Sequence, residues 1–162
     1  ADLDWLRQAL SQAGSRVVVL THVPLDGDVT DFSHSSVDGE AHPILSWGKS
    51  LPYAVRYPNA PEIRKIIADS GKVIACIAGH THWNQASCID GVAYITVPSL
   101  VERVMDAQGH AVPWNGAALI EYDAARDQMS IEVTGQKPVS YRVDPGKKGG
   151  GLSIGRGSTP SH

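Results

Sequence analysis

The sequence of 162 residues lacks most features of secreted, membrane-spanning or nucleic-acid-binding proteins. Its only two cysteines, Cys76 and Cys88, lie in apolar runs, which favours small buried thiols in a reduced protein over a disulfide framework. No signal peptide opens the chain, and no apolar run approaches the roughly 20 residues that a membrane-spanning helix needs. A net charge of −3 leaves no basic stripe for nucleic acid or an anionic membrane. Small molecules and proteins are therefore the expected partners.

The length and composition indicate one globular domain. A chain of this size can bury a sizeable core, and 42% of its residues are hydrophobic. The first residue is not methionine, so we expect a processed or truncated product. Residues 144–162 are rich in glycine and serine, which predicts a flexible tail after a folded part at residues 1–143.

The spacing of apolar residues predicts an α/β fold. Helical periodicity covers residues 3–13 and 60–70, and each stretch is followed by a glycine suited to end a helix. Continuous apolar runs at residues 16–22 and 72–79 predict strands that are buried on both faces. A strand, a helix and a second strand in this order predict a crossover unit of an α/β sheet.

Beyond residue 84 the pattern changes to short strands with no helix between them. We expect such strands at residues 85–90, 92–98, 117–123, 128–134 and 140–143. They favour antiparallel pairing, so the sheet is predicted to be mixed with an antiparallel C-terminal part. Residues 23–59 show no sustained period, and we interpret them as a loop or cap over a site because long aperiodic segments of compact domains are usually functional.

Three histidines lie at the ends of the two predicted buried strands. His22 ends the run RVVVLTH, whereas His80 and His82 follow KVIACIAG in the string IAGHTHW. Ligands gather outside the carboxyl ends of parallel strands, so these imidazoles are expected to converge. Histidine is a common ligand of zinc, iron and manganese, and Gly79 would let the backbone approach a metal closely. Two histidines that flank one residue can reach two ions about 3.5–4 Å apart, but an isolated pair is more often a solvated loop feature.

The strings VVVLTHVP, IAGHTHWN and GVAYITVPSLVE resemble, in order and spacing, the second half of the calcineurin-like metallophosphoesterases. The resemblance runs from about Asp4 to Glu121. It implies a two-sheet α/β sandwich with two divalent transition metals, Mn, Fe or Zn, at the strand ends. By position, His22 and His80 would bind the second metal and His82 the first. It further implies hydrolysis of a phosphomonoester or phosphodiester substrate by a hydroxide that the metals hold.

The earlier ligand blocks of that family do not precede the first predicted helix. They are an Asp-x-His pair, a Gly-Asp-x-x-Asp and a Gly-Asn-His. The string Gly27–Asp31 imitates the second block but lies after His22, and we interpret it as a decoy. Three imidazoles supply no charge to balance two ions, so we expect the other half of the centre on a missing N-terminal segment in cis or on a partner chain. The isolated chain should bind metal weakly and hydrolyse phosphodiesters negligibly.

Two further histidines and two further functions stay open at this point. His34 and His42 are candidate substrate-binding residues in the aperiodic stretch, but loop residues of this kind more often anchor the loop itself. The chain could also be a non-catalytic metal-binding or interaction module, or a purely structural α/β domain. Metal content separates the structural domain from the other two, and phosphodiester hydrolysis separates the enzyme from the non-catalytic module.

Overall fold

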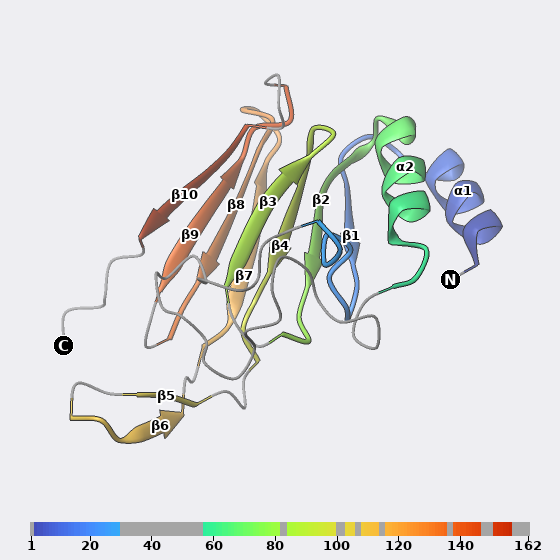
Figure 1. Ribbon diagram of the computed structural model, residues 1–162. Helices are drawn as coiled ribbons and strands as arrows, with labels where there is room; N and C mark the ends of the chain where they lie inside the picture. The colour runs from blue at the N-terminus through green and yellow to red at the C-terminus, as the bar shows by residue number, and fades with distance from the viewer. Residues whose placement is uncertain are drawn as a thin grey trace.

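The computed structural model describes residues 2–29, 57–81, 84–99, 103–105, 108–113, 116–135, 138–146 and 151–156. Over these residues the chain is an α/β protein with two helices and two four-stranded sheets, one mixed and one antiparallel, together with a two-stranded sheet. Neither helix of the described part is long and apolar enough to cross a membrane. Figure 1 shows both helices on one face of the mixed sheet and the antiparallel sheet on its other face.

The elements follow each other along the chain with short strands after the second helix. The helices are α1 (Leu3–Gln12) and α2 (Ala60–Ser70). The mixed sheet holds β1 (Val17–Leu20), β2 (Val73–Ala78), β3 (Gln85–Ile89) and β4 (Val92–Thr96), in the order β1-β2-β4-β3. The antiparallel sheet holds β7 (Ala118–Asp123), β8 (Gln128–Val133), β9 (Val139–Val143) and β10 (Leu152–Arg156), in the order β10-β9-β8-β7. The small sheet pairs β5 (Arg103–Met105) with β6 (Ala111–Pro113).

Both helices were predictable from local signals, and the structure confirms them. Asp2 caps α1 because its side chain accepts a hydrogen bond from the Trp5 backbone N–H at 3.0 Å. Pro61 occupies the first turn of α2, where its missing N–H costs nothing. Gly71 ends α2 in the left-handed conformation, with φ of 61°, which favours glycine.

The predicted crossover unit is present, but its first strand is less buried than expected. β1 pairs parallel with β2, β2 pairs parallel with β4, and β3 closes the sheet antiparallel to β4. All six residues of β2 are buried. The prediction that residues 16–22 form a strand buried on both faces is wrong, because β1 lies at the edge of the sheet and its Leu20 is 71% exposed.

Two apolar clusters cover the two faces of the mixed sheet. The cluster between the sheets joins β2 and β4 to β8 and β9, through Ile74, Ala75, Ile77, Ala93, Ile95, Met129, Ile131, Val133, Val139, Tyr141 and Val143. The cluster under the helices joins the sheet to both helices, through Leu10, Leu25, Ile63, Ile67, Val73, Cys76, Val92 and Tyr94. The mixed sheet is therefore the middle layer of three, and burial on both faces explains the continuous apolar runs of its central strands.

The C-terminal stretch is not entirely a flexible tail. Residues 151–156 include β10, which pairs antiparallel with β9 from Leu152 opposite Val143 to Arg156 opposite Val139. The composition of this segment predicted a tail because β10 has only 5 residues, too few to give a clear strand pattern among the glycines and serines. Gly155 suits the strand, since a Cβ there would lie 2.7 Å from the Ser140 Oγ on β9. The strands β5 and β6 were also not predicted.

An ion pair ties the start of β1 to the turn between β7 and β8. The Arg16 guanidinium donates from Nε and Nη2 to the Asp127 carboxylate, which also accepts from the Tyr122 hydroxyl at 2.6 Å. This contact joins residues 111 apart and places the β1 edge and the β7 edge on the same side of the molecule. The hydrogen bonds from Arg16 and then Tyr122 hold the pKa of Asp127 below its ordinary value.

We predict that Asp127→Asn lowers stability in a pH-dependent way. A carboxyl group whose pKa is depressed by folding contributes stability above its unfolded pKa, near about 3.9, and loses it as the pH falls through the folded value. The difference in free energy of unfolding between wild type and variant should thus be largest near neutral pH and shrink below about pH 4. Urea unfolding from pH 3 to 7 measures it. The difference should be smaller in an Arg16→Gln background, and a difference independent of pH would contradict the assignment.

Candidate metal centre

The hydrogen-bond ladder between β1 and β2 continues past the ends of both strands. The Thr21 N–H donates to the Ile77 carbonyl at 3.0 Å, and the Gly79 N–H donates to the His22 carbonyl at 3.1 Å. The chain thus stays paired as far as His22 on one side and the residue before His80 on the other. Because parallel strands end at the same edge of a sheet, both histidines leave the ladder at one place.

The structure brings His22 and His80 together, as their positions predicted. His22 Nε2 and His80 Nδ1 lie 3.0 Å apart, and the two rings meet edge to face with centroids 4.8 Å apart. His22 is exposed and His80 is partly buried, so the pair borders solvent. His82 lies outside the described residues, as do His34 and His42, and their expected roles stay predictions.

The two ring nitrogens lie at hydrogen-bonding distance, and which of them donates depends on the tautomers of the rings. Neutral imidazoles are also common ligands of divalent metals, so His22 and His80 would be the residues that hold an ion here. Within the described ranges, no cluster of three or more His, Cys, Asp or Glu residues is present. Among the described residues, His22 and His80 are therefore the two candidate ligands that the structure brings together.

The backbone at His80 adopts a conformation that L-residues avoid. Its φ is 68°, in the left-handed region, where histidine is tolerated better than bulky or β-branched residues. Backbone strain of this kind clusters at functional sites, where side-chain placement outweighs its cost. Gly79 shows no such demand, because its φ is not positive and a Cβ there would meet nothing within 4 Å. The expectation that Gly79 lets the backbone approach a metal closely stays a prediction.

Two buried polar side chains that follow His80 in the sequence lack hydrogen-bond partners. In the part of the chain that the structure describes, Thr81 Oγ1 and both amide atoms of Asn84 have none. Thr81 is 4% exposed and Asn84 is fully buried. Because an unsatisfied buried polar group costs free energy, such groups mark places where water or an ion completes the bonding. This observation is independent of the histidine pair and lies in the same IAGHTHWN segment.

The loop after His22 is held against α2 and β3 by two polar contacts. Arg64, which is 7% exposed, donates to the Leu25 carbonyl at 2.6 Å and to both oxygens of Asp28. The buried Asp26 carboxylate accepts from the Ser87 hydroxyl at 2.6 Å. Sequence reasoning missed Arg64, because a cation beside the apolar stripe of a helix usually reaches solvent.

The aspartates of this loop have structural partners. Asp28, in the string Gly27–Asp31, forms an ion pair with Arg64, whereas Asp31 lies outside the described residues. The pairing supports the interpretation of this string as a decoy, since the Asp28 carboxylate already neutralises a buried cation. Cys76 is a poor ligand, because burial, with Asp26 nearby, raises the pKa of its thiol to about 12 and keeps it protonated.

The chain matches no protein-family model and no curated protein.

We predict that His80→Gly is at least as stable as wild type, whereas His80→Ala is less stable than His80→Gly by about 1 kcal/mol. Glycine adopts a φ of 68° without the Cβ clash that alanine meets there. Chemical denaturation of the three proteins measures the effect. Gly79→Ala is the matched control and should cost less than the difference between the two His80 variants. Equal stability of His80→Ala and His80→Gly would show that the site stores no backbone strain.

We also predict that Asp28→Asn lowers stability without changing metal affinity. The substitution removes the anion that neutralises the buried Arg64, a loss of about 3 kcal/mol for a pair of this burial. Unfolding by urea and Zn²⁺ titration by calorimetry measure the two quantities. A folded Asp28→Asn variant that loses Zn²⁺ binding to the same extent as His80→Ala would show that the string Gly27–Asp31 does supply metal ligands.

Proposed function

We propose that this chain supplies histidine ligands to a dinuclear divalent-metal centre that hydrolyses a phosphomonoester or phosphodiester, on a fold of the metallophosphoesterase type. The observation that supports it most is the 3.0 Å approach of His22 Nε2 and His80 Nδ1 at the carboxyl ends of two adjacent parallel strands. Divalent cations bound there would serve as Lewis acids toward a phosphate ester and lower the pKa of water.

The chain's own residues prepare the histidine pair for this role. The shared ladder holds the His22 backbone, and the left-handed turn directs the His80 ring from the end of β2. The Thr21 hydroxyl donates to the Val23 carbonyl at 2.9 Å and closes a tight turn around His22. Arg64 fixes the rest of the loop through Leu25. Ligands placed by backbone contacts of this kind lose little conformational freedom when an ion binds.

The charge of the centre must come from further residues. His22 and His80 are imidazoles, and the two aspartates in the described part of the following loop, Asp26 and Asp28, are engaged by Ser87 and Arg64. A pair of divalent ions needs carboxylates to bridge them and to balance their charge. We therefore propose that these ligands come from residues beyond the described ones, either upstream in cis or on a partner chain, with His82 as a third imidazole.

A non-catalytic metal-binding module is the second candidate. It is favoured by the absence of a third metal ligand around His22 and His80 within the described residues. Two imidazoles can hold a single ion without organising a substrate, and such a protein would bind metal but not turn over phosphate esters. Turnover is therefore the property that separates the two candidates.

We predict that the 162-residue chain binds Zn²⁺ or Mn²⁺ weakly and through His22 and His80. In calorimetric titrations, His22→Ala and His80→Ala should weaken binding by about tenfold or more, because even the loss of a residue that only orients a metal ligand costs about that much. His110→Ala, a change at an exposed histidine, is the matched control and should leave binding unchanged. Hydrolysis of p-nitrophenyl phosphate and its diester should be negligible for the chain alone. It should appear when a polypeptide that carries the earlier ligand blocks is added, and His80→Ala should remove it.

Two results would contradict this proposal in different ways. Metal binding that survives both histidine substitutions would remove the site. Strong turnover by the chain alone, dependent on His80, would show that the described and remaining residues already hold a complete centre.

A further inference from the structure

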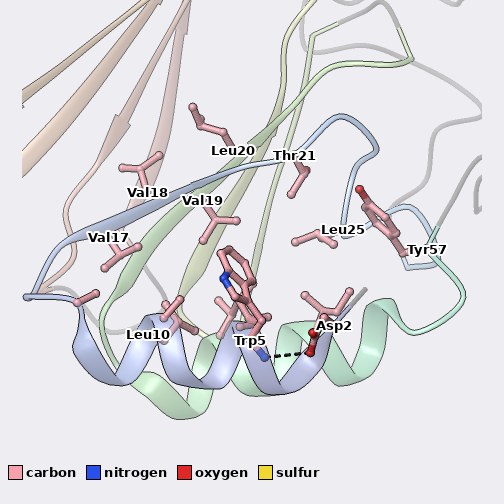
Figure 2. A pocket seen from close by; sticks show the side chains of 15 residues that line it. Asp2, Trp5, Leu10, Val17, Val18, Val19, Leu20, Thr21, Leu25 and Tyr57 are labelled. Atoms are coloured by element: carbon pink, nitrogen blue, oxygen red, sulfur yellow. Dashed lines mark hydrogen bonds between the residues drawn. The ribbon is translucent and has the colours of Figure 1, made fainter.

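Two threonines follow the two parallel strands whose histidines meet, and in the described part of the chain only Thr21 has a partner for its hydroxyl. Thr21 lies where β1 leaves the sheet (Figure 2), and its hydroxyl donates to the Val23 carbonyl at 2.9 Å. This bond closes the turn around His22. Thr81 follows His80 after the end of β2, and no described residue bonds to its hydroxyl. The turn of His80 is therefore not closed in the way that the turn of His22 is.

The turn at His80 links the Thr81 side chain to the direction of the His80 ring. The Thr81 N–H donates to the Gly79 carbonyl at 2.8 Å, across His80 with its φ of 68°. A three-residue turn with a positive φ at its centre is the rare and strained form. Thr81 is 4% exposed, whereas His80 borders solvent. Because the turn is this tight, a bond at the Thr81 hydroxyl would hold the His80 ring in place.

Asn84 lies at the same edge of the mixed sheet as this turn. It precedes β3, which starts beside the end of β4. The Val97 N–H continues from β4 and donates to the Ala78 carbonyl at 2.8 Å, next to the turn. Asn84 follows Thr81 by three residues, so their Cα atoms lie at most about 11 Å apart. Two side chains and a bridging water molecule can cover such a distance.

Asn84 brings both a donor and an acceptor to this edge. It is fully buried, and neither its amide nitrogen nor its amide oxygen has a partner among the described residues. This holds whichever way the amide is oriented, since both atoms are unpartnered. By contrast, Arg64 and Asp26, which are also buried, form hydrogen bonds within the protein. Because an unsatisfied buried amide costs free energy, Asn84 requires a partner of another kind.

Water suits these atoms better than an ion does. A cation would satisfy the oxygens of Thr81 and Asn84 but would repel the amide N–H groups of Asn84, and an anion would do the reverse. A water molecule donates and accepts at once, and a buried water typically makes about three hydrogen bonds to polar groups. The Thr81 hydroxyl and the Asn84 amide can supply these bonds.

We propose that Thr81 and Asn84 share one buried water molecule, which joins the turn of His80 to the start of β3. Asn84 is thereby a positioning residue of the candidate metal centre, because it acts on the His80 ring through the water and Thr81. A ring that is held before an ion arrives loses less conformational freedom when the ion binds. The water site itself does not depend on a metal, whereas its effect on metal affinity rests on the proposed function.

Substitutions at Thr81 can separate the hydroxyl from the shape of the side chain. Thr81→Val keeps the shape and removes the hydroxyl, whereas Thr81→Ser keeps the hydroxyl and removes a methyl group. If Thr81 only fills space, Thr81→Ser is the more harmful change. If it binds water, Thr81→Val is the more harmful one. Asn84→Leu, which keeps the approximate shape of the amide, is an independent variant at the other end of the link.

We predict that the metal-free wild-type chain holds one more long-lived water molecule than Thr81→Val or Asn84→Leu. Oxygen-17 relaxation dispersion of water measures this difference, and buried waters elsewhere contribute equally to all variants. Thr81→Ser should give the wild-type value. Equal values for wild type, Thr81→Val and Asn84→Leu would overturn the proposal, and so would a lower value for Thr81→Ser than for Thr81→Val.

Zn²⁺ titration of the same variants tests the positioning role. Thr81→Val and Asn84→Leu should each weaken binding by about tenfold, as the loss of a group that orients a metal ligand does. The double variant should bind as either single variant does, because each substitution breaks the same link. Ser87→Ala is the matched control on β3, since its hydroxyl bonds to Asp26, and it should leave the affinity unchanged.

The titrations also distinguish failure of this inference from failure of the proposed function. Additive losses in the double variant would show that Thr81 and Asn84 act separately. An affinity that falls in His80→Ala but not in Thr81→Val or Asn84→Leu would remove the positioning role. Either result would overturn the inference. If the water measurement agrees with the prediction and no variant, His80→Ala included, changes the Zn²⁺ affinity, only the proposed function fails.

Discussion

The parallel ladder between β1 and β2 is the interaction on which the candidate site depends. It continues through Thr21 and Gly79 beyond the strands, and so the His22 and His80 rings meet although 58 residues separate them in the chain. Each backbone hydrogen bond contributes only about 1 kcal/mol net. The ladder is stable because β2 is buried between the antiparallel sheet and the helices. The geometry of the site thus follows from the packing of three layers rather than from contacts between the histidines.

The buried arginine shows how the same layers hold the loop after β1. Arg64 lies on the helix that connects β1 to β2, and it is nearly excluded from water. A buried cation is tolerated only when anions and carbonyls neutralise and solvate it, which here are Asp28 and Leu25. The helix is thereby attached to the loop that begins at His22. Movement of this loop away from α2 would leave the Arg64 charge unpaired. The contacts of Arg64 therefore hold the loop in place.

Two features of the molecule lie along the edge strand β1. Just beyond its carboxyl end lies His22, whose ring contacts that of His80 in the candidate site. Leu20 of β1 and the neighbouring Trp5 of α1 remain exposed beside an apolar cavity (Figure 2). The edge strand therefore borders both the candidate site and an exposed apolar surface.

The sequence by itself determined both helices, the strands of the crossover unit and the meeting of two histidines. Helical periodicity located α1 and α2, apolar runs located β1 and β2, and the shared edge of parallel strands placed His22 near His80. Only the tertiary structure decided which strand lies at an edge. The run VVVL of β1 is typical of a central strand, and yet β1 lies at the edge and its Leu20 is exposed. Strand order could not be predicted because it depends on pairing between distant segments. The same holds for β10 and for the pairing of Arg64 with Asp28, since neither a strand's partner nor a charge's environment is encoded within its own few residues.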